Sequence, residues 1–311
     1  MLIAPKYLKK FKCLAGACPE SCCKQGWEIA LDTDTVRHYK ACGVLDIEEH
    51  LKIGADGDTV LKLKENGVCP YLNKDGLCDL YIASNGVLGE ICREYPRFYE
   101  EYDGFTETGI SVSCPEALRL VFNATEEDYT LTDAKTDDNL LNFLILARKT
   151  AFSVIFNEKT AENATKKLLY LGYLLQEAID FGESEANTLP KANELNQADF
   201  EYQTAELKEI LLQCEILNPR WQELLKSPEV QATEATEQEK KSYLAYLCYR
   251  YFLKGINTED ELQVINAIIG AFRLTTALPC NLKTATTLFA KEIEHNPENI
   301  QKWFSLYETE I

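Results

Sequence analysis

The sequence has few basic residues for its length. Its 311 residues include 32 Lys and Arg against 50 Asp and Glu, a net charge of −18. Nucleic acid is therefore not expected as a partner, because phosphate binding depends on Lys and Arg. The acidity also argues against an anionic membrane surface. The longest apolar stretch, residues 140–156, is interrupted by Asn142, Arg148 and Lys149, so we expect no membrane partner.

The first ten residues, MLIAPKYLKK, lack the apolar segment and cleavage site of a secretory signal peptide. We therefore expect a cytoplasmic protein. Thiols stay reduced in the cytoplasm, so a group of cysteines there indicates metal ligands or redox chemistry rather than disulfides.

Several common motifs are missing. No C-x-x-C pair is present, which argues against a zinc ribbon, and the C-x3-C-x2-C spacing of radical S-adenosylmethionine enzymes is absent. No G-x-G-x-x-G stands between a predicted strand and helix, so an ordinary Rossmann methyltransferase or dehydrogenase is not indicated.

Cysteine, in contrast, is abundant and unevenly placed. Nine of the 12 Cys precede residue 115. Eight of these nine form two groups along the chain: Cys13, Cys18, Cys22 and Cys23, then Cys69, Cys78, Cys92 and Cys114.

Thiolates at such spacings are typical ligands of tetrahedral zinc or of an iron–sulfur cluster. Cys18, Cys69 and Cys114 each precede Pro, which restrains the backbone after a ligand. Adjacent side chains are expected to diverge, so Cys22 and Cys23 are hard to place on one zinc ion. The spacing leaves two arrangements open, one four-Cys cluster with spare thiols or two four-Cys sites.

For residues outside these two groups of cysteines, the sequence gives weaker indications of a role at the metal site. Trp27 is expected to shield the metal site, and the three His (38, 50 and 295) have no ligand spacing. Cys42 is undecided. Three single cysteines, Cys214, Cys248 and Cys280, are expected to pack in the helical part.

Two arginines directly follow one of the thiols. Arg93, Tyr95 and Arg97 come immediately after Cys92. Guanidinium groups there would offset thiolate charge or hold the carboxylate of a bound cofactor, and the alternative is exposed ion pairs. These three residues are the candidates for cofactor binding.

The chain changes character near residue 125. We predict a mainly α protein with two domains: an irregular cysteine-rich metal-binding domain with short strands (1–125) and an all-α helical domain (126–311). The acidity is greater in the second part: residues 1–122 have a net charge of −5 and the remainder −13. A metal would supply folding energy that the turn-rich first part lacks.

Apolar residues at three- and four-residue spacing predict six helices in the second part. Thr236 and Thr258 each stand three residues before a Glu, which is the spacing of a capping box. Residues 182–199 are the candidate linker. The predicted helices are 138–157, 164–181, 204–217, 236–254, 259–278 and 283–295.

An aromatic stripe occupies one of these helices: Tyr243, Tyr246, Tyr249, Tyr251 and Phe252, with Arg250 among them. Helical spacing favours a core role, and a groove for a protein substrate is the alternative.

In the first part, residues 32–40 predict a short helix capped by an Asp or a Thr, and residues 59–64 alternate like a strand. Residues 72–77 predict a hairpin turn with Asp75-Gly76 at the bend, and residues 104–109 a loop.

The cysteine blocks resemble a known family. The run from Phe11, F-K-C-x4-C-P-E-S-C-C-x3-W-E-I, followed by Asp32-x2-Thr35-x3-Tyr39, is similar to the opening of the flagellin lysine N-methylase family. The later blocks C-P-Y-L, G-L-C, I-C-R-E-Y-P-R and S-C-P-E follow in the family's order. They also resemble the wider family of cysteine-rich zinc- or iron-chelating proteins. The similarity covers residues 11–116 and is looser in the helical part.

The resemblance implies methyl transfer from S-adenosylmethionine to lysine side chains of flagellin, with an iron–sulfur cluster, expected to be 4Fe-4S. It implies that the cluster ligands are drawn from the eight grouped cysteines. The alternative is a non-enzymatic module that binds zinc or iron through cysteine and uses its helical part for interactions.

Overall fold

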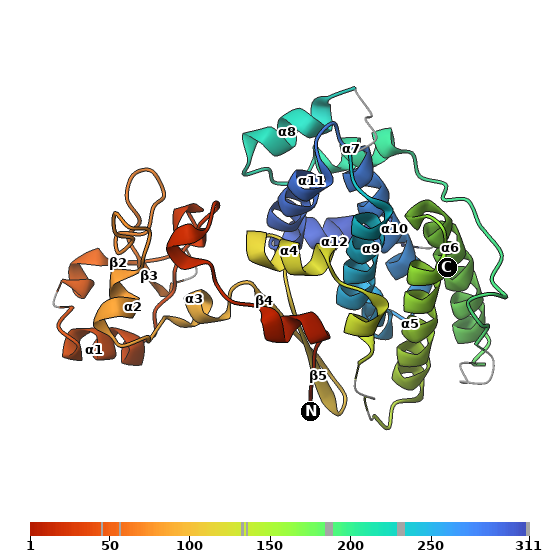
Figure 1. Ribbon diagram of the computed structural model, residues 1–311, viewed down its shortest axis with the longest axis horizontal. Coiled ribbons are helices and arrows are strands. Elements are labelled where there is room, and N and C mark those ends of the chain that lie inside the picture. The colour runs from red at the N-terminus through yellow and green to blue at the C-terminus, as the bar shows by residue number, and fades with distance from the viewer. Residues whose placement is uncertain are drawn as a thin grey trace. The chain divides into compact units, whose positions relative to one another are not determined.

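The computed structural model divides the chain into two compact units (Figure 1). The helical unit comprises residues 1–11, 99–113 and 117–311, and the cysteine-rich unit comprises residues 12–98 and 114–116. This division differs from the predicted boundary at residue 125. Residues 1–11 and 99–113 belong to the helical unit because they form most of a sheet that packs there. Residues 117–122 belong to it because they form most of a helix that packs there.

The structure describes residues 1–44, 46–55, 57–131, 134, 136–183, 189–228 and 234–308. The central part of the predicted linker, residues 184–188, lies outside these ranges.

Helices predominate in the described residues, so the mainly α prediction is confirmed. The helices of the helical unit are α4 (Pro115–Phe122, whose first two residues belong to the other unit), α5 (Asn139–Asn157), α6 (Ala161–Asp180), α7 (Thr204–Leu211), α8 (Pro219–Lys226), α9 (Glu237–Tyr251), α10 (Glu261–Ala277), α11 (Leu282–Phe289) and α12 (Pro297–Ser305). Short helical turns η1 (Lys6–Lys10), η5 (Glu126–Tyr129), η7 (Phe252–Asn257) and the π-helix η8 (Ala290–Glu294) connect them.

Side-chain caps explain where the long helices begin. Asp138 accepts a hydrogen bond from Leu141 N at 2.9 Å at the start of α5. Thr160 accepts from Asn163 N at 3.1 Å, so α6 begins earlier than predicted. The predicted capping box of Thr236 is confirmed. Each cap satisfies an amide at the helix start that has no carbonyl partner within the helix.

Three of the predicted helices differ in their bounds. The helix predicted at 204–217 ends at residue 211, and α8 starts anew after Asn218. The capping box predicted on Thr258 is wrong, because Asp260 is the cap and accepts from Gln263 N at 2.7 Å. The helix predicted at 283–295 becomes the π-helix η8 after residue 289.

A three-stranded sheet has the order β1–β5–β4 (Leu2–Ile3, Phe105–Ile110, Arg97–Tyr102), and all of it except Arg97 and Phe98 belongs to the helical unit. β1 pairs parallel to β5, with Leu2 opposite Thr106 and Ile3 opposite Glu107. The loop predicted over 104–109 is therefore wrong. Asp103 and Gly104 make the turn, with Gly104 at φ 80°, and the residues after them form the central strand.

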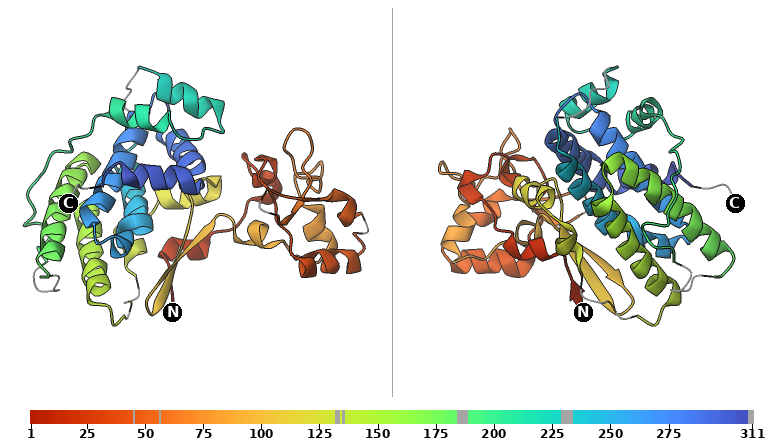
Figure 2. Two further views of the ribbon diagram at one scale, coloured as in Figure 1. Left: turned by 180° about the vertical axis from the view of Figure 1, so that it is seen from behind. Right: turned by 45° about the vertical axis from the view of Figure 1, so that its right-hand side comes forward.

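The core of the helical unit lies around α9 and α10. α10 packs against α6 and α9, and α5 runs beside α6, as Figures 1 and 2 show. The aromatic stripe of α9 is buried, as its spacing predicted, with Tyr243 and Tyr246 at 0% exposure. A surface groove on this stripe is excluded.

α5 is long and apolar enough to cross a membrane by length and composition. Such helices also occur in protein cores, and 56% of its apolar window is buried inside the structure.

One ion pair in this core is almost fully buried. Both Arg148 on α5 and Glu107 on β5 are 3% exposed. The guanidinium binds the carboxylate with two hydrogen bonds, one of them Nη1 to Oε2 at 2.8 Å, and Nη1 also donates to Tyr249 O at 3.4 Å. The pair joins the sheet to α5 and α9.

A second buried carboxyl has no such partner. Glu261 is 0% exposed, and neither of its oxygens has a hydrogen-bond partner among the described residues. The carboxyl packs on Gly255, where a Cβ would overlap Oε2. Burial raises the pKa of Glu261 well above its usual value, although the charge of Arg148 acts in the opposite direction.

Glu261→Gln is expected to stabilise the protein increasingly as the pH rises. Below about pH 3.5 the carboxyl is protonated in both the folded and the unfolded chain. At higher pH only the unfolded chain releases the proton, so the wild-type free energy of unfolding falls by up to about 1.4 kcal/mol per pH unit. The side-chain amide of the variant does not titrate, so the free energy of unfolding of the variant does not fall for this reason. Melting temperatures at about pH 5, 6.5 and 8 measure the growing difference.

The exposed Glu177 of α6 provides the matched control, since Glu177→Gln makes the same chemical change at a position that water reaches. A difference between Glu261→Gln and wild type that stays constant with pH would contradict the expectation.

The cysteine-rich unit has short elements around a small core. Its helices are α1 (Thr33–Ala41), α2 (Asp79–Ala83) and α3 (Glu90–Glu94), with short turns η2 (Ala15–Ala17), η3 (Cys22–Lys24) and η4 (Ile47–His50), and β2 (Leu51–Ile53) pairs antiparallel to β3 (Thr59–Leu61). Tyr39 and Ile47 are the most buried core residues, and Cys69 belongs to the same core.

Two local predictions in this unit are confirmed. Asp32 caps α1 by accepting from Thr35 N at 2.8 Å. The hairpin at 72–77 turns at Gly76, with φ 73°, and Leu72 bridges Cys78. The strand predicted over 59–64 is shorter and ends at Leu61.

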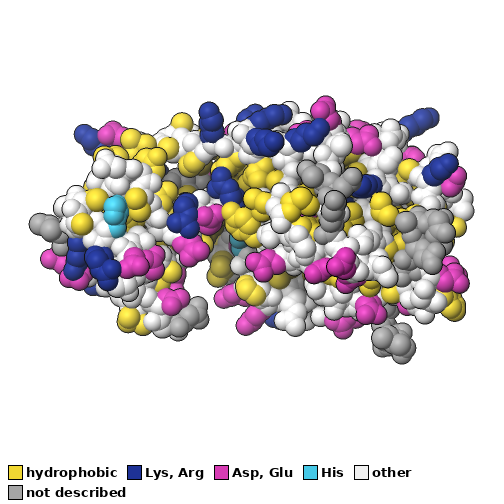
Figure 3. Space-filling model, turned by 90° about the horizontal axis from the view of Figure 1, so that it is seen from below, with side chains coloured by type: hydrophobic (Ala, Val, Ile, Leu, Met, Phe, Trp, Pro, Cys, Tyr) yellow, Lys and Arg dark blue, Asp and Glu magenta, His cyan; other side chains and the backbone are white. Residues whose placement is uncertain are grey.

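The surfaces have mixed charge. On the face in Figure 3, Asp and Glu side chains stand among Lys and Arg side chains, with hydrophobic side chains between them. In the cysteine-rich unit the exposed hydrophobic residues include Tyr81, Ile82 and Ile91.

Candidate metal centre

Four of the eight predicted thiols are mutual neighbours in the cysteine-rich unit. Cys23, Cys69, Cys78 and Cys92 interact electrostatically in every pairwise combination, and we call them the four-thiol set. Both groups in the sequence contribute, and Cys22 is likewise an electrostatic neighbour of Cys23 and Cys92.

Short elements position each member of the set. Cys23 lies in η3, and its carbonyl accepts from Cys69 N at 2.8 Å, which ties the two segments together. Cys78 is the residue before α2, immediately after the hairpin, and Cys92 lies in the middle of α3. Four separate backbone segments thus converge.

Three of the four thiols have a pKa above that of a free thiol, and the fourth has a lower one. Burial, followed by the neighbouring thiols, raises the pKa of Cys69 to about 11 and that of Cys92 to about 12. Burial also raises the pKa of Cys78. In contrast, a hydrogen bond with Cys22 lowers the pKa of Cys23 to about 6. A metal would therefore have to displace protons from the buried thiols of the set.

Cys22 and Cys23 are adjacent in the turn η3. The interaction of the two thiols raises the pKa of Cys22 and lowers that of Cys23. Whether both could bind one metal ion stays a prediction of the sequence.

The other predicted ligands lie outside the set. Cys13 is exposed, accepts from Ala15 N at 3.4 Å and is an electrostatic neighbour of Cys22. Cys18 follows η2, and Cys114 stands directly before α4.

The donor chemistry of the set fits a metal, since four cysteine sulfurs are the full ligand set of a structural zinc ion or of a 4Fe-4S cluster. In the part of the chain that the structure describes, no three His, Cys, Asp or Glu side chains are arranged to hold a metal ion.

The predicted cofactor-binding residues lie beside the set but bind other protein groups. Arg93 Nε forms an ion pair with Glu94 at 2.8 Å, and Arg97 Nη1 donates to Arg93 O at 3.3 Å. Tyr95 packs edge-on against Trp27, with 4.6 Å between ring centroids. Trp27 and Tyr95 thus form one aromatic contact.

The remaining cysteines and histidines are in other environments. Cys42 Sγ lies 3.5 Å from His38 Nε2 on α1. Cys214 and Cys248 are buried packing residues, as predicted, and Cys280 is half-buried. His295 Nε2 lies 3.0 Å from Ser111 Oγ and 2.9 Å from Ser113 Oγ, and burial lowers its pKa to about 4.

A scan against protein-family models finds no match to this chain, and searches of curated proteins and of solved structures also find none.

Proposed function

We propose that this chain is a cytoplasmic methyltransferase that transfers a methyl group from S-adenosylmethionine to lysine side chains of flagellin. In this proposal its cysteine-rich unit holds an iron–sulfur cluster, expected to be 4Fe-4S. The observation that carries the proposal is the four-thiol set, in which cysteines from four separate segments are mutual neighbours.

Cys23, Cys69, Cys78 and Cys92 would be the ligands of the cluster. An iron–sulfur cluster, when bound, supplies electron transfer, or an iron that binds a substrate if one ligand position stays open. The interaction with Cys22 lowers the pKa of Cys23, which favours a thiolate ligand. Hydrogen bonds to ligand sulfurs adjust the reduction potential of such centres.

The acceptor lysine imposes a further requirement. Its amine must be neutral to accept a methyl group by polar displacement, so apolar surroundings or a carboxylate base would be needed. Arg93 and Arg97, beside Cys92, are the proposed contacts for the carboxylate of the methyl donor.

The test combines metal analysis with an activity assay. Protein purified without oxygen should contain iron and sulfide, and should transfer label from S-adenosylmethionine to lysine of purified flagellin. Flagellin with acetylated lysines is the control acceptor. Absence of label on lysine, with the iron and sulfide content intact, would refute the methyltransferase proposal.

The same set also favours a second candidate, a non-enzymatic metal-binding module. Four mutually neighbouring cysteines are the closed ligand set of a structural zinc ion, which leaves no position for a substrate. Stoichiometric zinc without sulfide, together with no methyl transfer, would select this candidate.

A further inference from the structure

One corner of the helical unit is closed over a carboxyl group. η7 ends there, α10 begins, and Glu261, the first residue of α10, is 0% exposed. Neither of its carboxyl oxygens has a hydrogen-bond partner among the described residues. The carboxyl packs on Gly255 of η7, where a Cβ would overlap Oε2. The closed corner therefore deprives both oxygens of the hydrogen bonds that water would give them.

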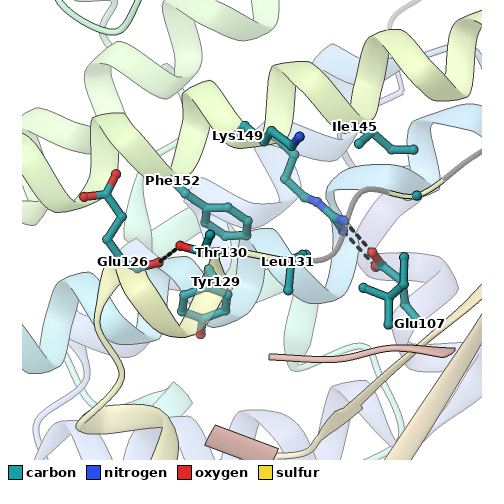
Figure 4. A pocket seen from close by; sticks show the side chains of 11 residues that line it. Glu107, Glu126, Tyr129, Thr130, Leu131, Ile145, Lys149 and Phe152 are labelled. Carbon is teal, nitrogen blue, oxygen red and sulfur yellow. Dashed lines mark hydrogen bonds and ion pairs between the residues drawn. The ribbon is translucent and has the colours of Figure 1, made fainter. Parts of the chain in front are cut away.

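The positive charge that acts on Glu261 is already bound to another acid. Burial opposes ionisation of Glu261, the charge of Arg148 on α5 favours it, and neighbouring Asp260 opposes it again. The guanidinium of Arg148 binds Glu107 with two hydrogen bonds, which are dashed beside the pocket in Figure 4. One guanidinium held in this way compensates one carboxylate and not two. The closed corner therefore favours a protonated Glu261.

The other titratable groups around the corner are paired or uncharged. Lys254 of η7 binds Glu100 of β4, with 2.8 Å between Nζ and Oε1. Cys248 of α9 and Tyr102 of β4 are electrostatic neighbours of Glu261. Burial raises the pKa of both groups, so both remain uncharged at neutral pH. None of these groups supplies a second cation for the carboxyl.

The backbone just before α10 has the features of a hinge. Glu259 is at φ 56°, in the left-handed region that a residue with a Cβ rarely adopts. Gln176 of α6 joins both sides of this point, because its Nε2 donates to Glu259 O at 3.0 Å and its Oε1 accepts from Glu261 N at 2.8 Å. A strained residue next to a buried ionisable group favours local opening at this point.

We propose that residues 252–264, which comprise η7 and the first turn of α10, form a proton-controlled latch. The latch is closed while Glu261 is protonated, and it opens to water when the carboxyl ionises. The step releases one proton and needs no other reactant. It does not depend on the proposed methyl transfer.

The direction of the pH effect follows from where the proton binds. In the closed latch the carboxyl keeps its proton, whereas in the open latch it is hydrated and ionises like an ordinary glutamic acid. A higher pH therefore favours the open latch, by about ten-fold per pH unit while the closed form stays protonated. The helices around the latch stay folded in this step, which distinguishes it from unfolding of the whole chain.

Amide hydrogen exchange of the full chain at about pH 5.5, 6.5 and 7.5 tests the latch. The amides of Glu259, Glu261 and Gln263 are hydrogen-bonded in the closed latch, so their protection from exchange measures its opening. After correction for the chemical exchange rate at each pH, this protection should fall about ten-fold per pH unit in the wild type.

Two conservative variants show whether the carboxyl of Glu261 is responsible. Glu261→Gln cannot ionise, so the protection of its latch should not depend on pH. Glu177→Gln is the matched control, because Glu177 is an exposed glutamate on α6, next to Gln176. Its latch should show the same pH dependence as the wild type.

Low concentrations of urea separate local from global opening. Opening of the latch exposes little surface, so exchange of its amides should depend weakly on urea, whereas amides in the middle of α9 should depend strongly on it. Gly255→Ala is an independent check, because the added Cβ displaces the carboxyl from its closed position. Its latch should be poorly protected at all three pH values while α9 stays protected.

Latch protection that does not change with pH in the wild type would overturn the proposal, as would an equal pH dependence in Glu261→Gln. Full latch protection in Gly255→Ala would also contradict it. Exchange of the latch with the same urea dependence as α9 would show that the carboxyl meets water only in the unfolded chain, and that result too would overturn the latch.

Discussion

Cys92→Ser is expected to leave the purified protein without the proposed metal and to unfold the cysteine-rich unit. Three cysteines do not complete the ligand set of a closed four-thiol site, and a serine hydroxyl is a poor ligand for zinc or for a cluster iron. Metal binding contributes about 10–16 kcal/mol to small zinc-dependent folds, which is more than most small cores provide. The expected change is therefore close to complete.

Metal content and amide hydrogen exchange measure this effect. Zinc, iron and sulfide should fall to background in Cys92→Ser, and amides of residues 12–98 should exchange rapidly, whereas those of α9 and α10 should stay protected. Cys42→Ser is the matched control, because Cys42 lies in the same unit and contacts His38 rather than the set. Full metal content in Cys92→Ser would show that Cys92 is not a ligand.

Arg148→Met is expected to lower the free energy of unfolding by about 3–5 kcal/mol, because it leaves the carboxylate of Glu107 buried without its partner. That carboxylate is almost completely shielded from water. The double variant Arg148→Met/Glu107→Leu should recover much of the loss, since it removes both charges and keeps a similar volume. Denaturant unfolding monitored on the full chain measures both effects.

Arg273→Met is the comparison for an exposed pair. Arg273 binds Glu162 at 2.7 Å, with 31% and 48% of the two side chains exposed. Water screens such a pair, so the loss should be about 1 kcal/mol or less. Equal effects of Arg148→Met and Arg273→Met would show that burial does not govern the strength of these pairs.

Local chemistry made much of the helical unit predictable. The Thr236 capping box and the Asp138 cap are complete within four residues of sequence, and both helices start where these residues place them. α8 and α12 were missed although each begins with Asn-Pro, at Asn218 and Asn296. An Asn cap followed by proline is a start signal that a search for apolar periodicity overlooks.

Features that depend on distant partners were not predictable. Residues 105–110 contain two Thr, a Glu and a Gly and read as a loop, and they form a strand because Leu2 and Ile3 pair with them. Likewise, sequence spacing identified eight candidate thiols but not which four are neighbours. Cys23 joins the three later cysteines because its carbonyl binds Cys69 N, a contact across 46 residues.

The way in which the chain passes between its two units determines which segment can be exchanged between proteins as one piece. The main cysteine-rich segment is an insertion between Phe11, which follows β1 and η1, and Tyr99, which lies within β4 of the same sheet. Domains inserted in this way can be gained, lost or exchanged as cassettes without reordering the host. Cys114 is the exception, because it lies after residues 12–98 in the sequence, directly before α4. Transfer of residues 12–98 to another host would thus carry the whole four-thiol set and leave Cys114 behind.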